Sequence, residues 1–396
     1  MEKKLSSVAK TLSPSPIQQL SYLAQECDAI NLAEGFPDFP APSSVKEAAI
    51  SAINSDFNQY RHVQGICEFV ARKMKQLQGI DVDPSTDVVI CCGQSEAFAA
   101  ASFAIIDPGD EVILFDPSYE TYDTCIRLAG GVPVYVALDP PHWTLSQDRF
   151  EKSFSEKTKA LVLNSPHNPT GKVFSTDDLR IIAAACKKRD VFAITDEVYE
   201  HLTYDDTPHV SLASLPEMQR RTIITSSLSK TFSVTGWRIG WAVAPSRIAS
   251  AIRNIHIKIT DSAPAPFQEA ALSALASPPS YFDSLRREYT SKRDAMVNLL
   301  IRIGFKTVFI PRGSVFVFAE LPPSCPLSDC EFVEKLIKEA GVVAVPGSGF
   351  FHCRNGEYCR RYIRFAFCKS HHTLASASEK MMGLVDDETG HFRLLF

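Results

Sequence analysis

Short β-branched runs alternate with helical patterns through the first 280 residues or so of this 396-residue chain. The runs are apolar throughout, as strands buried on both faces are. Such strands separated by helices predict a mostly parallel sheet covered by helices on both sides. The predicted strands are Val88–Cys91, Glu111–Phe115, Val132–Leu138, Ala160–Leu163, Phe192–Thr195, Thr222–Thr225 and Arg238–Val243.

Three helices are predicted between or before these strands. Ser43 or Ser44 is placed to cap a helix over Val45–Ile53. A second helix is expected over Ser95–Ile106. The third is expected over Asp177–Lys188, where Ser175 and Asp178 have capping-box spacing.

The pattern changes near residue 280, and 396 residues exceed what one compact core usually holds. A long charged helix is predicted over Tyr281–Ile303, and an α+β arrangement follows it. Its predicted elements are strands over Thr307–Ile310, Val315–Glu320 and Tyr362–Phe367 and a helix over Asp329–Ala340. We therefore expect a large domain over residues 46–279, a small domain over residues 280–396, and an N-terminal segment, residues 1–45, that packs with the small domain.

Charge and cysteine content exclude several classes of protein. Lys and Arg number 41 and Asp and Glu 46, a net charge of −5, which gives no support for nucleic acid or an anionic membrane as partner. No apolar run approaches the roughly 20 residues of a membrane helix, and the N-terminus lacks the apolar region of a secretory signal. The 11 cysteines form no C-x-x-C pair, so we expect no metal site and a reducing, cytoplasmic location.

The segment Ser227-Leu228-Ser229-Lys230 follows a predicted buried strand, and Arg238 comes eight positions after the lysine. A lysine that forms a Schiff base must be partly desolvated, so that its amine is neutral near pH 7. A phosphate group needs hydroxyl and guanidinium donors, which Ser227 and Arg238 supply. Lys230 is thus a candidate attachment point, although a lysine after serines is more often a solvated loop residue.

Asp196 and Tyr199 follow the end of the predicted strand Phe192–Thr195. A carboxylate beneath a pyridine nitrogen keeps that nitrogen protonated, and the ring then accepts electrons from a carbanion. Tyr199 is placed to donate a hydrogen bond to the phenolic oxygen of such a ring. The alternative for this segment is a helix cap or a turn.

Two polar turns also lie at predicted strand ends. The loop Asn164–Gly171 contains two X-Pro steps and a glycine, which make it rigid and present Asn168. Gly93, Gln94 and Ser95 lead into a helix N-terminus, where free N–H groups and the helix dipole favour a phosphate. Both segments also fit ordinary turns that bind nothing.

Arg364 stands inside the apolar run Tyr362–Phe367. An arginine in an apolar strand is costly unless it is paired. Its expected partner is either a structural carboxylate or the carboxylate of a substrate, which a guanidinium group binds in a bidentate manner.

Together these segments resemble the fold-type-I pyridoxal 5'-phosphate (PLP) enzymes and, within them, the class I and II aminotransferases. The resemblance extends from the sequence NLAEGFPD at residues 31–38 to Arg364, and the motifs HNPTG, DEVY and SLSKTFSVTGWRIGW stand in the order and spacing of the family. It implies a PLP-dependent aminotransferase with a seven-stranded, mostly parallel sheet in the large domain and a smaller α+β domain.

The resemblance implies a role for each matching residue around the cofactor ring. Lys230 is expected to hold PLP as an imine and later to carry the transferred proton, while Asp196 pairs with the pyridine nitrogen. Asn168 and Tyr199 are expected to bind the ring oxygen, and Tyr119 to stack on the ring.

The phosphate and substrate ligands follow from the same resemblance. The expected phosphate ligands are Ser227, Arg238 and the backbone of Gln94 and Ser95. Arg364, with Asn168 and the backbone of Gly35, is expected to bind the substrate α-carboxylate. Tyr60 matches a tyrosine that reaches the phosphate of the neighbouring subunit's cofactor, which implies a homodimer with shared active sites.

The chain is most similar to plant-type aromatic aminotransferases that use methionine, and it is also similar to kynurenine/glutamine-type aminotransferases. This implies methionine or an aromatic amino acid as donor and an aromatic 2-oxo acid, such as indole-3-pyruvate or phenylpyruvate, as acceptor. Phe36, Phe39, Tyr60 and Tyr119 favour an apolar side-chain pocket, with core packing as the alternative. Arg61 is a candidate second cation for a dicarboxylate.

Three other classes fit parts of the pattern. A PLP lyase, such as a cysteine-conjugate β-lyase or a relative of aminocyclopropane-carboxylate synthase, would use the same cofactor residues and differ in its products. A PLP-fold regulator usually carries a fused DNA-binding domain, for which the chain has no basic stretch. A nucleotide-binding dehydrogenase is disfavoured because no G-x-G-x-x-G follows a strand.

Overall fold

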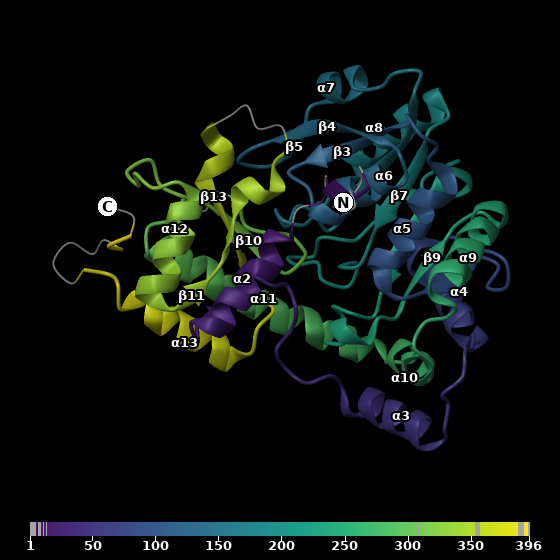
Figure 1. The fold of residues 1–396 in the computed structure, drawn as a ribbon, viewed down its shortest axis with the longest axis horizontal. Coiled ribbons are helices and arrows are strands. Elements are labelled where there is room, and N and C mark those ends of the chain that lie inside the picture. Colours follow the sequence, from purple (N-terminus) through teal and green to yellow (C-terminus); the bar gives the residue numbers. More distant parts are fainter. Residues whose placement is uncertain are drawn as a thin grey trace, which may run out of the picture.

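The computed structural model describes residues 5–6, 9–10, 12, 14–306, 309–352, 357–386 and 392–394. A larger α/β part lies on the right of Figure 1 and a smaller part on the left, with the purple N-terminal helix α2 beside the smaller one. None of the described helices has both the length and the apolar character needed to cross a bilayer.

The larger part is built on an eight-stranded sheet with the order β2-β9-β8-β7-β6-β3-β4-β5. Its strands are β2 (Val88–Cys91), β3 (Glu111–Asp116), β4 (Val132–Asp139), β5 (Thr144–Leu145), β6 (Thr158–Asn164), β7 (Phe192–Asp196), β8 (Thr222–Ser227) and β9 (Gly240–Val243). The strands β4, β3, β6, β7 and β8 run parallel, and β9 is antiparallel to both of its neighbours. The seven predicted strands are confirmed, and the eighth, β5, is too short to leave a sequence pattern.

Both faces of this sheet are covered, as continuous apolar strands predict. Successive residues of β3 point to opposite faces. Ile113 and Phe115 pack with Leu179 of α8 (Thr176–Arg189), whereas Val112 and Leu114 pack with Phe98 of α5 (Gly93–Ile105). The sheet is therefore the middle of three layers, and its strand ends are the positions left open to a ligand.

Some helices begin at a capping side chain and others do not. Ser175 and Asp178 form the predicted capping box at the start of α8. The predicted serine cap of α3 (Ser43–Asn54) is wrong, because Ser43 and Ser44 already lie in the first turn and Pro42 occupies the N-cap position. The remaining helices are α2 (Pro16–Glu26), α4 (Gln64–Gln78), α6 (Glu120–Leu128), α7 (Gln147–Lys152), α9 (Ser246–Thr260), α10 (Ala265–Leu275), α11 (Pro279–Arg302), α12 (Asp329–Lys335) and α13 (His371–Met382).

The smaller part contains a three-stranded antiparallel sheet with the order β10-β13-β12. These strands are β10 (Phe316–Glu320), β12 (Val345–Pro346) and β13 (Tyr362–Ala366). The predicted helix over 329–340 consists of α12 followed by a π-helical turn, Leu336–Ala340. Of the predicted strand Thr307–Ile310, residues 307 and 308 lie outside the described residues. Residues 309 and 310 form no strand, and Lys306 instead makes a bridge with Glu320.

The N-terminal segment joins the C-terminal part of the chain. Strand β1 (Ile30–Asn31) pairs in parallel with β11 (Val342–Val343), and α2 packs against β11 and β12. This pairing places residues 30–31 beside the smaller part. The domain boundaries at residues 45 and 279 stay a prediction.

Candidate active site

A cavity of about 290 Å³ lies where the two parts meet. Asp196 and Ser227, which line it, are the last residues of β7 and β8, so the cavity opens at the carboxyl edge of the parallel strands. Phe316 of β10 and Arg364 of β13 line it from the smaller sheet. Residues from both ends of the chain therefore line one cavity. It lies at the carboxyl ends of the strands, where ligands bind in open α/β sheets.

Asp196 is buried at the end of β7, in this cavity. Its Oδ1 accepts a hydrogen bond from the backbone N–H of Val198 at 3.1 Å, and its Oδ2 accepts one from the Tyr122 hydroxyl at 2.6 Å. Burial raises the pKa of Asp196 to about 6, and these hydrogen bonds only partly oppose that rise. The carboxylate forms no ion pair with any residue that the structure describes, so a cation in the cavity would stabilise it.

Tyr122 is a site residue that the sequence prediction missed. It lies three positions after Tyr119, on the first turns of α6, and both side chains line the cavity. The two rings meet edge to face with centroids 5.9 Å apart. The (i, i+3) spacing of two tyrosines after a strand was the available signal, because it places both on one helix face.

Lys230 follows β8 in the sequence, and its side chain enters the same cavity. The Nζ donates a hydrogen bond to the Gly35 carbonyl oxygen at 2.7 Å. Burial lowers the pKa of the Lys230 amine to about 8, and the positive charge of Arg364 acts in the same direction. A large share of these amines is therefore neutral near pH 8 and able to act as nucleophile or base.

Gly35 lines the cavity, and its carbonyl oxygen accepts the Lys230 hydrogen bond; the predicted backbone contact of Gly35 with a substrate carboxylate stays a prediction. A Cβ at this position would lie 2.4 Å from the ring of Phe316. Only glycine fits there, so the residue lets the N-terminal segment lie directly on β10.

Arg238 lies against the first residue of α5. Its guanidinium group donates to the Thr235 carbonyl oxygen at 2.8 Å, and a Cβ on Gly93 would come within 2.3 Å of its Nη2. Gly93 also has a φ of +80°, so both conformation and space require glycine. Gln94 and Ser95, at the N-terminus of α5, line the cavity beside this guanidinium, an arrangement that suits a phosphate.

The side chains of Gln94 and Ser227 each make one hydrogen bond within the protein. The Gln94 amide donates to Thr225 Oγ1 at 3.1 Å, and its backbone N–H is one of the free donors at the helix start. Ser227 is buried at the end of β8, and its Oγ accepts from the Ser229 backbone N–H at 3.3 Å. The predicted phosphate ligands thus lie on three adjacent segments of one wall.

Arg364 is fully buried on β13. Its Nη1 donates to Asn168 Oδ1 at 2.9 Å and its Nη2 donates to the Ala33 carbonyl oxygen at 2.7 Å. Its Nε is buried without a hydrogen-bond partner among the described residues. The structural carboxylate weighed as its partner is absent among those residues, and the guanidinium group, which makes only these two hydrogen bonds, is part of the cavity lining.

Asn168 and Tyr199 complete the wall opposite α5. The Asn168 backbone N–H donates to Asn164 Oδ1 at 2.7 Å, which fixes the loop after β6. Tyr199 is buried, and burial raises its pKa well above the ordinary value, so the hydroxyl keeps its proton and remains a donor. Its ring meets Phe316 edge to face.

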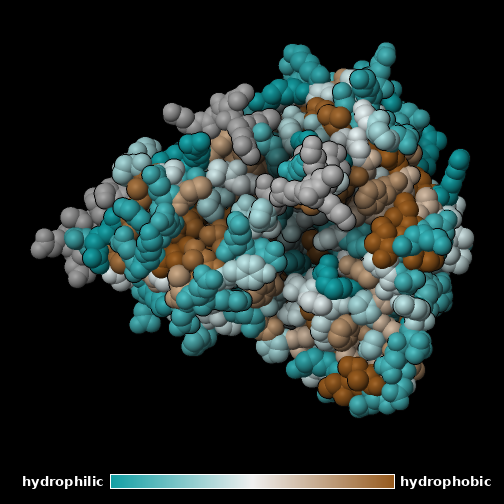
Figure 2. Space-filling model, viewed as in Figure 1, coloured by the Kyte–Doolittle hydropathy of each residue, from teal (hydrophilic) through white to brown (hydrophobic). Residues whose placement is uncertain are grey.

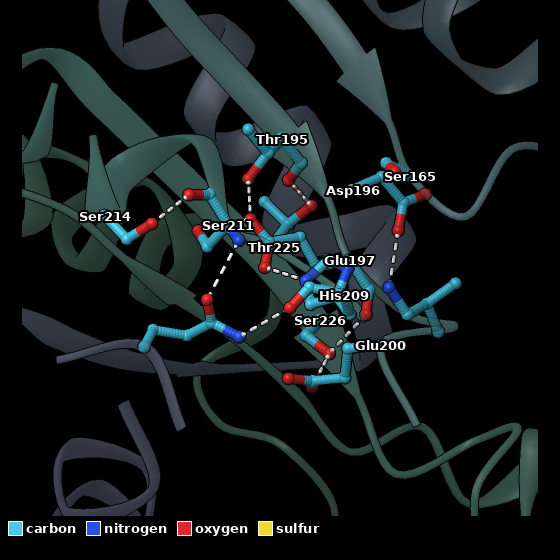
Figure 3. Close-up of polar contacts among 12 residues, drawn as sticks. Ser165, Thr195, Asp196, Glu197, Glu200, His209, Ser211, Ser214, Thr225 and Ser226 are labelled. Carbon is cyan, nitrogen blue, oxygen red and sulfur yellow. Dashed lines mark hydrogen bonds and ion pairs between the residues drawn. The ribbon is translucent and has the colours of Figure 1, made fainter. Parts of the chain in front are cut away.

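A buried polar network surrounds Glu197, the residue that follows β7 (Figure 3). Glu197 Oε1 accepts from Thr195 Oγ1 at 2.9 Å and from Ser211 Oγ at 2.8 Å, and Oε2 lies 2.7 Å from His209 Nε2. Burial lowers the pKa of His209, but the adjacent Glu197 carboxylate outweighs it and the net shift is upward. This network fixes the backbone that carries Asp196.

Two predicted residues lie outside this cavity. Tyr60 is 78% exposed, and Arg61 forms an ion pair with Glu269 at 2.7 Å and stacks on Phe57 at 4.2 Å. Within one chain, neither side chain reaches Lys230 or Arg364.

Among the described residues one group, Cys91, Glu96 and His256, has the composition of a metal site. Glu96 Oε2 accepts from the Cys92 backbone N–H at 2.9 Å and lies 3.0 Å from His256 Nδ1. Glu96 Oε2 is therefore already hydrogen-bonded, whereas Oε1 is buried without a hydrogen-bond partner among the described residues.

Fold and site together define a PLP-dependent α/β enzyme with a buried lysine, carboxylate and arginine in one cavity. The family model "Aminotransferase class I and II" matches residues 28–380. Human kynurenine–oxoglutarate transaminase 1 is 36% identical over 93% of this chain and 95% of its own length. Escherichia coli (strain K12) methionine aminotransferase is 36% identical over 92% of this chain and 95% of its own length.

Solved structures agree with these sequence comparisons. N-succinyldiaminopimelate aminotransferase from Mycobacterium tuberculosis superposes with a TM-score of 0.91 at 34% identity, over 95% of this chain and 99% of that one. The chain therefore belongs to the class I and II aminotransferases, a family that depends on PLP.

The charge of Asp196 predicts a pH-dependent difference in stability between the cofactor-free wild type and Asp196→Asn. The pKa of Asp196 is raised from 3.8 to about 6 on folding, so its stabilising contribution is present below pH 3.8 and is lost as pH rises through 6. Asparagine does not titrate. Between pH 4 and 7, the free energy of unfolding of the wild type should fall by about 2 kcal/mol relative to the variant.

Urea unfolding of both cofactor-free proteins across this range measures the difference. Because every other titrating group is common to the two proteins, parallel pH curves would contradict an uncompensated buried carboxylate at position 196.

Proposed function

We propose that this aminotransferase transfers the amino group of methionine or an aromatic amino acid to an aromatic 2-oxo acid such as indole-3-pyruvate or phenylpyruvate. The observation that carries this proposal is the composition of the cavity. Arg364 lies beside apolar and aromatic side chains, among them Ile17, Phe36 and Phe316. The names of the E. coli and human relatives, which specify methionine and kynurenine, support the same class of donor.

The residues of the cavity fit each group of PLP. When bound, PLP supplies an electron-accepting pyridine ring, an aldehyde and a phosphate. The Lys230 amine, whose pKa is lowered to about 8, would bind the aldehyde carbon. The Asp196 carboxylate, which has no ion-pair partner among the described residues, would hold a proton on the ring nitrogen. Tyr199 and Asn168 would donate to the ring oxygen, and Tyr119 would lie against the ring.

The phosphate would lie at the N-terminus of α5. Gln94 and Ser95 present backbone N–H groups there, and the positive end of the helix dipole favours a dianion. The Ser227 hydroxyl and the Arg238 guanidinium add donors from the adjacent wall.

Arg364 would bind the substrate α-carboxylate, because it lines the cavity, no described carboxylate pairs with it, and two hydrogen bonds leave three of its five N–H donors unused. Asn168 holds Arg364 Nη1 and fixes the plane of the guanidinium group. A carboxylate held at one end orients the Cα–H bond, and orientation of this kind contributes strongly to catalysis. Lys230 Nζ, released from the cofactor by the incoming amino group, would then remove the Cα proton.

A homodimer in the cytoplasm is the assembly and location we propose. Tyr60 is 78% exposed in one chain and would contact the phosphate site of the partner. Exposed apolar side chains lie on two helices of the larger part: Ile50 and Ile53 on α3, and Ile257 and Ile259 on α9. A brown patch lies at the bottom of Figure 2, where Figure 1 places α3. No two of the described cysteines form a disulfide, which suits a reducing compartment.

A matrix of amino donors and 2-oxo acids tests the proposal. Methionine and phenylalanine paired with phenylpyruvate or indole-3-pyruvate should give the highest kcat/KM, and double-reciprocal plots should be parallel, because the 2-oxo acid formed from the donor leaves before the acceptor binds. Stoichiometric formation of a new amino acid, without free ammonia, distinguishes transfer from a lyase reaction. Intersecting plots, or ammonia as the main nitrogen product, would overturn the proposal.

A further inference from the structure

Glu34 places a carboxylate in the wall of the cavity that contains Lys230 and Arg364. It directly follows Ala33, whose carbonyl oxygen accepts the hydrogen bond from Arg364 Nη2. The same part of the cavity therefore contains a cation, Arg364, and an anion, Glu34, which follows the hydrogen-bond partner of Arg364 in the sequence.

The Glu34 side chain is held in a defined position. Asn31 Oδ1 accepts hydrogen bonds from the backbone N–H groups of Ala33 and Glu34 at 2.9 and 3.1 Å, which closes a turn after β1. Glu34 Oε2 accepts from Ser21 Oγ at 2.6 Å. Ser21 follows Ile17 by one helical turn of α2, so the face of α2 that lines the cavity also anchors Glu34.

The two carboxylate oxygens of Glu34 are not equivalent. Oε2 is bound by Ser21 and, at 3.5 Å, by Asn31 Nδ2, whereas Oε1 makes no hydrogen bond with any described residue. An oxygen of this kind accepts hydrogen bonds from a ligand and repels a second anion.

Among the described residues that line the cavity, no further cation is left for a second substrate carboxylate, and Lys369, which interacts electrostatically with Glu34, is not part of the lining. Of the described residues that line it, the cationic ones are Lys230, Arg238 and Arg364, and the proposed function uses all three. Arg61, the candidate second cation, already pairs with Glu269 at 2.7 Å. Within one chain, a dicarboxylate would thus bring its second charge into a cavity of about 290 Å³ beside Glu34, without a further cation among the described residues that line it.

We propose that Glu34 is a specificity-determining residue that excludes side chains ending in a carboxylate and admits neutral ones, particularly those with an N–H donor such as an amide or an indole. This inference rests on the proposed function, since it concerns the substrates of the same site. It assigns 2-oxoglutarate and glutamate to the disfavoured substrates of this enzyme.

The substitution Glu34→Gln tests the charge alone, because the amide oxygen still accepts from Ser21. The ratio of kcat/KM for 2-oxoglutarate to that for phenylpyruvate, with methionine as donor, should rise at least tenfold in Glu34→Gln. The matched control is Glu26→Gln, which removes the same charge from an exposed position at the end of α2 and should leave the ratio unchanged.

A binding measurement that does not depend on turnover accompanies the kinetics. Glutarate and 3-phenylpropionate carry no transferable group, and their dissociation constants for the holoenzyme report the side-chain preference directly. Glu34→Gln should lower the dissociation constant of glutarate at least tenfold and change that of 3-phenylpropionate by less than twofold.

The outcomes separate this inference from the proposed function. A wild type that transaminates phenylpyruvate but shows the same substrate ratio as Glu34→Gln would overturn the role of Glu34 and leave the proposed function intact. A wild type that prefers 2-oxoglutarate to phenylpyruvate would overturn the inference and the acceptor class together. A wild type that transaminates no pair would overturn the proposed function itself.

Discussion

Lys230→Ala is expected to lower kcat by about 10⁴-fold or more, because the variant loses both the covalent hold on PLP and the general base. Lys230 is the sole lysine among the described residues that line the cavity, and the Gly35 carbonyl and the burial of its amine set its position and its pKa of about 8. The half-reaction with methionine, followed by the visible absorbance of the cofactor, measures the loss.

Covalent labelling supplies the control. Borohydride, which makes the carbon–nitrogen link to the cofactor permanent, should fix PLP to the peptide that contains Lys230 in the wild type and not in Lys230→Ala. Lys369 is a matched residue, since it is also buried and donates to a backbone carbonyl, that of Phe36, at 2.9 Å. Lys369→Met should retain the label on Lys230; a label on Lys369 in the wild type would refute the assignment.

Arg364→Ala is expected to lower kcat/KM for methionine by about 10³-fold, because removing one partner of a buried charged hydrogen bond costs about 2–5 kcal/mol. The loss should appear mainly with substrates that carry an α-carboxylate. Arg364→Lys keeps the charge but not the planar guanidinium group, so its kcat/KM for methionine should lie between those of the wild type and Arg364→Ala.

Methioninamide distinguishes a carboxylate ligand from a structural residue. This substrate lacks the α-carboxylate, so the wild type and Arg364→Ala should use it with similar low efficiency if Arg364 acts on the carboxylate. Equal losses for methionine and its amide, in a variant that retains the cofactor absorbance, would show that Arg364 only supports the fold.

The larger sheet could be predicted because each of its main strands is apolar on both faces. Ile113 and Val112 face opposite helical layers, and a strand of this kind leaves a continuous run in the sequence. The two-residue strand β5 leaves none, and its pairing with β4 depends on the chain turning back after Asp139.

The predicted site residues were recognisable because strand ends concentrate polar side chains at one edge of a parallel sheet. The residues that were missed depend on long-range packing. Tyr122 contacts Asp196, 74 positions away in the sequence, and Glu34 lines the cavity only because Ser21 and Asn31 fold the N-terminal segment onto it. The pairing of Arg61 with Glu269, which removes a free cation, is likewise invisible in local sequence.

The pairing of β1 with β11 has a consequence for biosynthesis. One end of the cavity combines Ala33 with Arg364. It can form only when both residues have been synthesised, and they are 331 positions apart in the sequence. A nascent polypeptide can assemble much of the central sheet while still on the ribosome, but the pocket closes only after Arg364 has left the exit tunnel. Emergence of Arg364 from the tunnel, rather than translation of the lysine region, therefore sets the earliest moment at which this enzyme becomes competent.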